Sequence, residues 1–528
     1  MKKILGLSLV AATMAFASTA DDIAKLEKEI AKLKKKVGKV NAQAANDNIK
    51  WGVDLRTAID NINYDMADGS TVGKNDLMSM RLWLNMAYSP DSHNVFKGQL
   101  SMNKAFGADF GTPGNGNNAM SMGGMFDWTA NEALTDNTLK VRQAYWLYLG
   151  DRAFGLDMPW TFSIGRRPST NGFLASLRDD DPAQSPLGHI INVEFDGLSS
   201  KLDLSSVTGV PGMSFKICMG QGSTNAQPLF ETATPYANGE GSNIEDITLA
   251  GFIFEPYNDG QIITKFTWYR AFDLPGMDMA IDPNTNMPVV DPNTGKFTYA
   301  PTGFNQYGDM DGAAFSVLID GITEDGYFSD AKIFASYAWS KTRPDAGKSM
   351  LGSTESETGT SYWLGAQLPV TDDGKFGLEY NHGSQYWRPF TYAEDTMIGS
   401  KLAVRGDAYE AYFTYQINDA LSAQIRYTNI DYDYTGSNGF FGNYTGGANK
   451  ISDMKAGAAN WDKITAATGN PDPTDPAAIQ AVVGALMQQG MDQQSAMKAA
   501  GQMAGAKAFL PNIVESAQDF RFYIRYRF

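Results

Sequence analysis

The sequence predicts an all-β fold: a transmembrane antiparallel β-barrel of about 16 strands (roughly 14 to 18), preceded by a short coiled-coil helix. Three observations lead to this prediction. The N-terminus has the features of an export signal. Short and long connections alternate along the candidate strands. The final strand alternates between an apolar face and a face that carries arginines.

Residues 1–20 are predicted to be a signal peptide. Lys2 and Lys3 form a basic start, and residues 4–16 form an apolar stretch that is too short to span a bilayer. Ser18 and Ala20 provide small side chains for cleavage. No later stretch reaches about 18 apolar residues. The mature chain is therefore expected to be secreted, periplasmic, or inserted in an outer membrane as strands.

Composition narrows these choices. The mean hydropathy of −0.31 argues against a helical membrane protein. Aromatic residues at 12% and 53 glycines fit aromatic girdles and tight turns. The single cysteine, Cys218, excludes an intrachain disulfide and a Cys-based metal site, and no Cys-x-x-Cys-His haem motif occurs, so no cofactor is expected. The net charge of −16 argues against nucleic acid as a partner.

Residues 21–42 are predicted to form a periplasmic coiled coil, because apolar residues recur at heptad spacing. The seam consists of Ile23, Leu26, Ile30, Leu33, Val37 and Val40. A single amphipathic helix lying on the barrel or on a membrane is the alternative interpretation. Ile and Leu in these positions favour dimers in isolated peptides, so the rest of the protein would have to impose a trimer.

Residues 43–528 are predicted to form the barrel. The candidate strands are 50–60, 77–88, 94–105, 138–148, 159–167, 188–205, 213–220, 246–256, 260–271, 313–320, 330–340, 360–369, 374–383, 404–417, 420–432 and 517–528. Connections after even-numbered strands are short, and those after odd-numbered strands are mostly long, with 61–76 intermediate. This parity is typical of outer-membrane barrels, which have short periplasmic turns and long external loops.

The final strand provides the clearest facing pattern. Phe520, Phe522 and Ile524 fall on one face, and Arg521 and Arg525 on the other. Tyr526 and Phe528 at the terminus resemble the C-terminal assembly signal of Gram-negative outer-membrane proteins. The chain as a whole resembles porins, most of all porin-like proteins with a short N-terminal coiled coil. The resemblance implies recognition by the barrel-assembly machinery, outer-membrane lipid around the barrel, and a homo-oligomer, with a trimer favoured.

A barrel of this size encloses an aqueous channel, and arginines in its strands are expected to face the lumen or its rim. The candidate pore-lining residues are Arg81, Arg142, Arg166, Arg167, Arg270, Arg426, Arg521, Arg525 and Arg527. Such a ring would favour anions. Loop acids such as Asp179, Asp180 and Asp181 would favour cations at a mouth, but we interpret them as solvated loop carboxylates. Selectivity therefore stays open.

Two loops have distinct compositions. The loop at 272–312 repeats Asp-Pro-Asn at Asp282 and Asp291, which predicts turns in preference to calcium ligation. The loop at about 433–516 is rich in Ala, Gln and Met, which predicts one or two helices that cap the pore or fold into it.

An enzyme is not expected, because the three histidines, His93, His189 and His382, show no catalytic pattern and are interpreted as polar surface residues. The sequence predicts a porin in the cell outer membrane, with both termini periplasmic, that passes small hydrophilic solutes or ions by passive diffusion. The alternatives are a structural or interaction protein, acting as envelope anchor or adhesin, and a barrel sheath around a partner protein.

Overall fold

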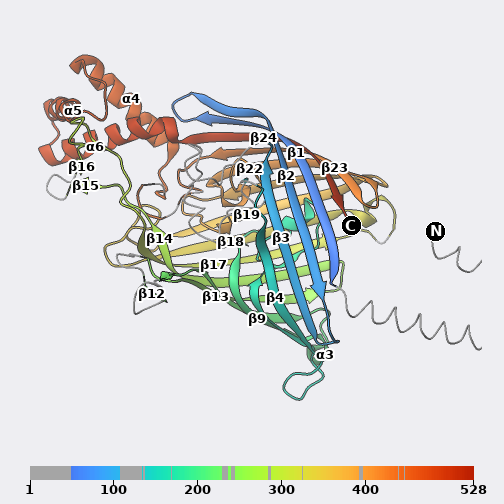
Figure 1. The fold of residues 1–528 in the computed structure, drawn as a ribbon. Helices are drawn as coiled ribbons and strands as arrows, with labels where there is room; N and C mark the ends of the chain where they lie inside the picture. Colours follow the sequence, from blue (N-terminus) through green and yellow to red (C-terminus); the bar gives the residue numbers. More distant parts are fainter. Residues whose placement is uncertain are drawn as a thin grey trace, which may run out of the picture.

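The computed structural model contains a closed antiparallel β-barrel (Figure 1). The structure describes residues 49–107, 134, 137–167, 169–228, 236–238, 244–282, 287–323, 325–391, 396–437, 439, 441–444 and 446–528. Within these residues 16 strands form the barrel, as the sequence predicts. The predicted signal peptide and coiled coil lie outside the described residues and stay predictions.

The barrel strands follow one another around the wall in chain order. They are β1 (Lys50–Met66), β2 (Thr71–Tyr88), β3 (Asn94–Ala105), β4 (Lys140–Gly150), β5 (Trp160–Arg167), β9 (Phe195–Asp203), β10 (Ser214–Ser223), β13 (Ile247–Asn258), β14 (Ile262–Gly276), β17 (Asn305–Asp320), β18 (Lys332–Pro344), β19 (Thr358–Thr371), β20 (Gly374–Gly383), β22 (Gly406–Asn418), β23 (Leu421–Tyr432) and β24 (Val514–Arg527). The ring closes between β1 and β24, where Val53 N donates to Phe528 O at 3.1 Å and Phe528 N donates to Val53 O at 3.0 Å.

The strands form because polar and apolar residues alternate with the period of two that a barrel wall requires. In β24, Phe520, Phe522 and Ile524 are exposed on the outer face, and Arg521 and Arg525 are buried inside. The facing predicted for this strand is therefore confirmed. The same pattern recurs in the other strands, so the outer wall is apolar and aromatic and the inner wall is mostly polar.

Connection lengths follow the predicted parity. We call one end of the barrel the short-turn end. Its connections are 89–93, 151–159, 204–213, 259–261, 321–331, 372–373 and 419–420. The connection at 204–213 contains α3 (Ser205–Thr208), and the one at 321–331 contains η5 (Tyr327–Asp330). At the opposite, long-loop end, the connections are 106–139, 168–194, 224–246, 277–304, 345–357, 384–405 and 433–513. These loops include two small hairpins, β11 (Ala226–Pro228) with β12 (Tyr236–Asn238), and β15 (Ile281–Asp282) with β16 (Met287–Pro288).

The expected intermediate connection at 61–76 is wrong. The ladder of β1 and β2 continues beyond Asn61, with Ile62 opposite Lys74 and Tyr64 opposite Val72, and only residues 67–70 form the turn. The strand persists because side chains still alternate here, although the outward positions, such as Asn61 and Asn63, have become polar.

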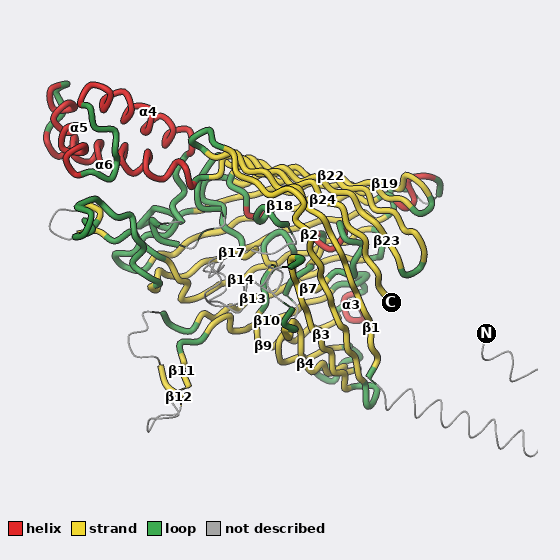
Figure 2. Tube along the Cα trace, turned by 45° about the horizontal axis from the view of Figure 1, so that its top comes forward, coloured by secondary structure: helices red, strands yellow, loops and turns green. Residues whose placement is uncertain are grey.

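The last long connection holds three helices, one more than the upper number predicted. They are α4 (Ile451–Thr468), α5 (Pro476–Gln488) and α6 (Gln493–Phe509), followed by η7 (Leu510–Asn512). Asp475 and Asp492 begin the second and third helices by accepting hydrogen bonds from Ala477 N and Ser495 N. The helices pack on their own small core beyond the ends of the strands, at the end opposite the C-terminus (Figures 1 and 2). Among the described residues, no helix is long and apolar enough to cross a membrane.

Two long connections fold into the barrel. We call residues 169–194 the plug and residues 384–391 with 396–405 the inner loop. The plug holds the parallel pair β6 (Gly172–Phe173) and β7 (Gln184–Leu187), η4 (Ala175–Leu177) and β8 (Ile191–Asn192). Its β8 pairs in parallel with β21 (Phe390–Thr391) of the inner loop, which ends in η6 (Lys401–Ala403). Inside the ring of strands, Figure 2 shows these loops around β7.

Candidate functional site in the barrel lumen

The tip of the plug is tied to the last strand of the barrel by ion pairs. Arg525 Nη2 lies 2.7 Å from Asp181 Oδ1, and Arg527 Nη1 lies 3.0 Å from the same atom. Arg525 Nη1 also donates to the backbone oxygen of Asp179 at 2.8 Å. Lys375 at the start of β20 reaches Asp180 at 2.9 Å. Since β24 ends and β20 begins at the short-turn end, the plug extends through most of the lumen.

Asp179 is buried and the side chain of Asp181 is only 7% exposed, so the interpretation of these two as solvated loop carboxylates is wrong. Asp181 pairs with Arg525 and Arg527 of β24, and the carboxylate of Asp179 accepts a hydrogen bond from the hydroxyl group of Tyr523 at 3.0 Å. Asp180 is the exception, because its side chain stays partly exposed in its contact with Lys375. Neither spacing nor composition signals these contacts, since Asp179 and Asp181 lie more than 300 positions from Arg525.

The base of the plug is held at a second place in the wall. Glu194 pairs with Arg142 at 3.3 Å and with Arg166 at 2.7 Å. Arg142 also donates to Thr170 Oγ1 at 2.6 Å and to Gln99 Oε1 at 2.8 Å. The first and last residues of the plug, near Thr170 and Glu194, are therefore held at the same place on the wall, at Arg142.

Trp83 lies between two guanidinium groups on this side of the lumen. The guanidinium carbon of Arg81 lies 3.5 Å from a ring centre of Trp83, and that of Arg142 lies 4.3 Å away. Arg81 also pairs with Asp54 at 3.6 Å. Cation–π contacts of this kind gain strength where water is excluded.

The centre of the lumen contains a buried charge cluster that joins wall, plug and inner loop. Glu410 on β22 pairs with Lys401 of the inner loop at 2.5 Å and with Arg178 of the plug at 3.2 Å. Lys401 also reaches Glu379 on β20 at 2.7 Å. Arg426 lies 3.9 Å from Glu410. Removing one partner of such a buried group leaves the other charges uncompensated, which lowers the free energy of unfolding by about 3–5 kcal/mol.

The remaining candidate arginines lie in three settings. Arg521 Nε is 2.5 Å from Asp60 Oδ1 in the buried wall. Arg270 pairs with Asp311 at 2.7 Å and is partly exposed towards the long-loop end, where Arg343 shares the same carboxylate. Arg167 faces a small cavity beside Lys216 and Cys218.

Carboxylates therefore compensate most of the positive charge that the predicted ring of arginines would place in the described wall. Of the nine candidates, Arg81, Arg142, Arg166, Arg270, Arg426, Arg521, Arg525 and Arg527 each lie within 4.0 Å of a carboxylate. The sequence predicts the inward side of the strands but gives no sign of the partners that the plug provides, Asp181 and Glu194. The prediction missed three inward side chains of β1: Asp54, Arg56 and Asp60. They alternate with outward residues along the strand, so this period of two could have identified them.

The lumen also contains a buried apolar cluster. Plug residues Leu187 and Ile190 pack in one buried cluster with Trp363, Trp387 and Phe390. The inner loop passes so close to the wall that a Cβ on Gly383 would collide with the backbone oxygen of Val404. This packing, together with the charge clusters, fixes the plug as part of the folded core.

His189 is completely buried within this cluster, so its interpretation as a polar surface residue is wrong. Its Nδ1 lies 2.8 Å from Ser336 Oγ and its Nε2 lies 2.9 Å from Ser361 Oγ. The ring lies between Trp363 and Trp387, with centroid distances of 5.7 and 5.6 Å. The histidine thus satisfies hydrogen bonds of the wall from inside the plug.

Turn chemistry explains the aspartate of the second Asp-Pro-Asn repeat, as predicted. Asp291 Oδ1 accepts a hydrogen bond from Asn293 N at 2.8 Å. In the described part of the chain, no group of three His, Cys, Asp or Glu residues is arranged to hold a metal ion.

Comparison with known proteins identifies a family. The family described as "Protein of unknown function (DUF3373)" matches residues 71–469, which is more than half of the chain. The chain belongs to this family. The family's matched region extends from β2 to the end of α4 and so includes the plug and the inner loop. No curated protein matches the chain.

Among solved structures, similar barrels include Salmonella typhi OmpF in complex with daunomycin. This structure is 10% identical, with 92% of this chain and 99% of that chain covered and a TM-score of 0.41. A loop L8 deletion mutant of OmpT, an outer membrane protein of Vibrio cholerae, is also 10% identical, with 91% and 99% covered and a TM-score of 0.40.

Proposed function

We propose that this protein is an outer-membrane channel for small hydrophilic solutes whose lumen is narrowed by the plug. The outer wall supports a location in a membrane, because exposed apolar and aromatic side chains recur around the barrel. Trp51, Tyr337, Leu364, Tyr427 and Ile524 are each more than 40% exposed. Such a surface is typical of a wall that contacts lipid. We place the short turns and the C-terminus on the periplasmic side of the membrane, as is usual for outer-membrane barrels.

The observation that carries the proposal is the plug, which extends from the long-loop end to Arg525 and Arg527 near the end of the chain. An open 16-stranded barrel would leave a wide aqueous channel. Here residues of the plug pack in a buried apolar cluster with the wall and also form ion pairs with it. This arrangement favours a narrow or gated passage over an open diffusion pore, and the paired charges favour weak ion selectivity.

Two further parts of the proposal depend on the porin resemblance. Tyr526 and Phe528, which are exposed at the end of β24, are proposed to be read by the barrel-assembly machinery. The protein is proposed to assemble as a homo-oligomer, with a trimer favoured.

An interaction protein is the second candidate function, because α4, α5 and α6 stand beyond the strands on the proposed external side (Figure 1). An enzyme is not part of either proposal. A sheath around a partner protein is disfavoured, since the plug occupies the space that such a partner would need.

Conductance in planar lipid bilayers tests the channel, with a plug-deleted variant as the decisive comparison. The two ends of the plug meet where Asn192 Oδ1 accepts a hydrogen bond from Asn171 N at 2.8 Å. Replacing residues 173–190 with a short Gly-Ser linker therefore leaves the strands connected. We expect small conductance steps from the full chain and severalfold larger steps from the variant, because the emptied lumen approaches an open barrel.

The control deletes the exposed residues 325–328 on the short-turn side and should conduct like the full chain. Silence from folded full-length and plug-deleted protein alike would contradict the channel and favour the interaction protein. Equal conductance from these two proteins would contradict the narrowing role of the plug.

A further inference from the structure

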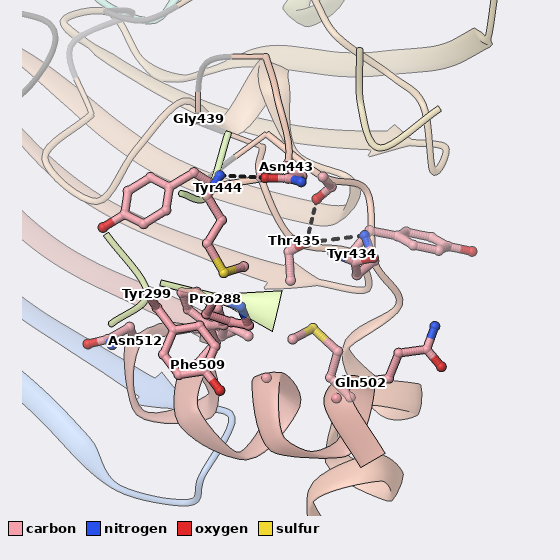
Figure 3. Close-up of a pocket in the computed structure, with 18 of the residues that line it drawn as sticks. Pro288, Tyr299, Tyr434, Thr435, Gly439, Asn443, Tyr444, Gln502, Phe509 and Asn512 are labelled. Carbon is pink, nitrogen blue, oxygen red and sulfur yellow. Dashed lines mark hydrogen bonds between the residues drawn. The ribbon is translucent and has the colours of Figure 1, made fainter. Parts of the chain in front are cut away.

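A cavity of 1510 Å³ lies at the long-loop end, and none of the described residues that line it belongs to the charge clusters of the lumen. Its described walls come mainly from residues of the loops at 277–304 and 433–449 and from α6 with the residues that lead into β24. Ile398 of the inner loop, Tyr432 at the end of β23 and Met454 of α4 complete them. Figure 3 shows Pro288, Tyr299 and Phe509 close together on one side of this cavity and Gln502 on another. Ligand pockets of folded proteins hold about 300–1,000 Å³, so this cavity has room for an extended ligand.

The rim of the cavity is built in advance of any ligand. Asn443 Oδ1 accepts a hydrogen bond from Met279 N at 2.7 Å, and Asn443 N donates to Asp278 Oδ1 at 2.9 Å. Phe297 N donates to Thr474 O at 2.7 Å, which joins the same loop to the helices. A site whose walls are already fixed loses less entropy on binding.

The charges of the cavity differ from those of the whole chain. The protein has 59 acidic residues, yet no carboxylate is among the described residues that line the cavity, and Lys498 is the one charged side chain there. Six side-chain amides line it instead: Asn443, Asn449, Gln493, Gln494, Gln502 and Asn512. An amide both donates and accepts hydrogen bonds, as does a hydroxyl group. The lining therefore matches a neutral ligand with many hydroxyl groups better than an ion of either sign.

The same cavity also has an apolar and aromatic side. Tyr299 and Phe509 meet edge to face with ring centroids 5.3 Å apart, and Met287 and Pro288 continue this surface. Tyr432, Tyr434 and Tyr444 add three further aromatic rings. Sugar rings have apolar C–H faces and hydroxyl edges, so a site with both aromatic and amide surfaces fits them on both counts.

We propose that this cavity binds a neutral oligosaccharide. The aromatic side chains contact the C–H faces of the sugar rings, and the amides of α6 bind their hydroxyl groups. Gln502 is the clearest contact, because its exposed side chain makes no hydrogen bond within the described residues. The cavity lies at the proposed external face, so it would capture the ligand there. The proposal does not depend on conduction through the lumen.

Isothermal titration calorimetry on the full chain in detergent tests the proposal. The probes are a panel of neutral hexasaccharides, an anionic oligogalacturonate of equal length, and a neutral hexapeptide. We expect at least one neutral hexasaccharide to bind. Gln502→Ala should weaken that binding by about fivefold, as loss of one hydrogen bond does. Gln488→Ala, on an exposed position of α5 outside the cavity, should leave it unchanged.

Preference for the anionic oligosaccharide or the peptide would overturn the proposal, as would the absence of binding to every neutral sugar at millimolar concentration. An equal loss of affinity in both variants would also overturn it. Because conductance plays no part in this readout, failure here and failure of the proposed channel are distinguishable.

Discussion

At the residue scale, Glu410 shows how charge is accommodated inside the barrel. Its carboxylate is fully buried and contacts Lys401 and Arg178, and Thr428 Oγ1 donates a hydrogen bond to it at 2.8 Å. Buried ion pairs add little net stability compared with apolar residues, but losing one member leaves its partners uncompensated. Glu410 therefore connects three parts of the chain that are far apart in sequence.

We predict that Glu410→Leu destabilises the folded barrel by about 3–5 kcal/mol, because Lys401, Arg178 and Arg426 lose their shared partner in a buried site. Urea unfolding in detergent, followed by gel mobility of unheated samples, measures the change. Lys455→Ala is the control, since its pair with Glu515 at 2.8 Å is exposed and should contribute within about 1 kcal/mol. Equal unfolding midpoints for both variants would contradict the role given to Glu410.

How far residues could be predicted depends on the range of their contacts. The inward side of Arg521 and Arg525 follows from local alternation, so the sequence predicts it correctly. Their carboxylate partners divide into two kinds. Asp54 and Asp60 lie in a strand with the same alternation, whereas Asp179 and Asp181 reach the wall only because the plug folds inward, and alternation gives no signal for that.

At the element scale, strands with regular alternation were predicted closely. The predicted bounds of β3 and β20, 94–105 and 374–383, agree with the structure. The predicted strand at 188–205 combines part of the plug with β9, because Ile190, Ile191 and Val193 are apolar for packing inside the lumen. In the sequence, apolar residues that pack inside the lumen cannot be distinguished from apolar residues on the outer face of a strand.

The helices at the long-loop end are joined to a neighbouring loop by a polar contact. Lys296 Nζ lies 2.6 Å from Asp472 Oδ2, in the turn between α4 and α5. Lys296, followed by Thr474, donates hydrogen bonds that lower the pKa of Asp472 from 3.8 to about 2. The carboxylate is thus held in its charged form on the outside of the barrel.

We predict that this contact weakens as the pH falls from about 4 towards 2. A lowered pKa in the folded state contributes stability above the ordinary value, and this stability is lost as the carboxylate is protonated. Pepsin cleavage within 287–304, normalised to a denatured substrate, should rise across this range. Asp472→Asn should be cleaved at a nearly constant normalised rate. The same rise in wild type and variant would contradict the assignment to Asp472.

At the scale of the whole molecule, two faces of one wall have opposite chemistry. The outer face exposes apolar and aromatic side chains, and the inner face is buried against the plug and the inner loop. The overall barrel and its loop parity could be predicted because every strand repeats the same local rule. The filling of the lumen could not, because it depends on contacts between distant parts of the chain.

Spin labels along β1 test this organisation most directly, in a Cys218→Ser background with labels attached to the unfolded chain before it folds into lipid bilayers. Leu55 and Ile59 point outward, whereas Ala58 is only 7% exposed on the inner face. We predict high oxygen accessibility at 55 and 59, and low accessibility at 58 to both oxygen and a water-soluble nickel complex. A label at 58 that the nickel complex reaches as readily as one at Val72, an exposed position on β2 at the long-loop end, would contradict a filled lumen. Low oxygen accessibility at 55 and 59 would contradict contact with lipid.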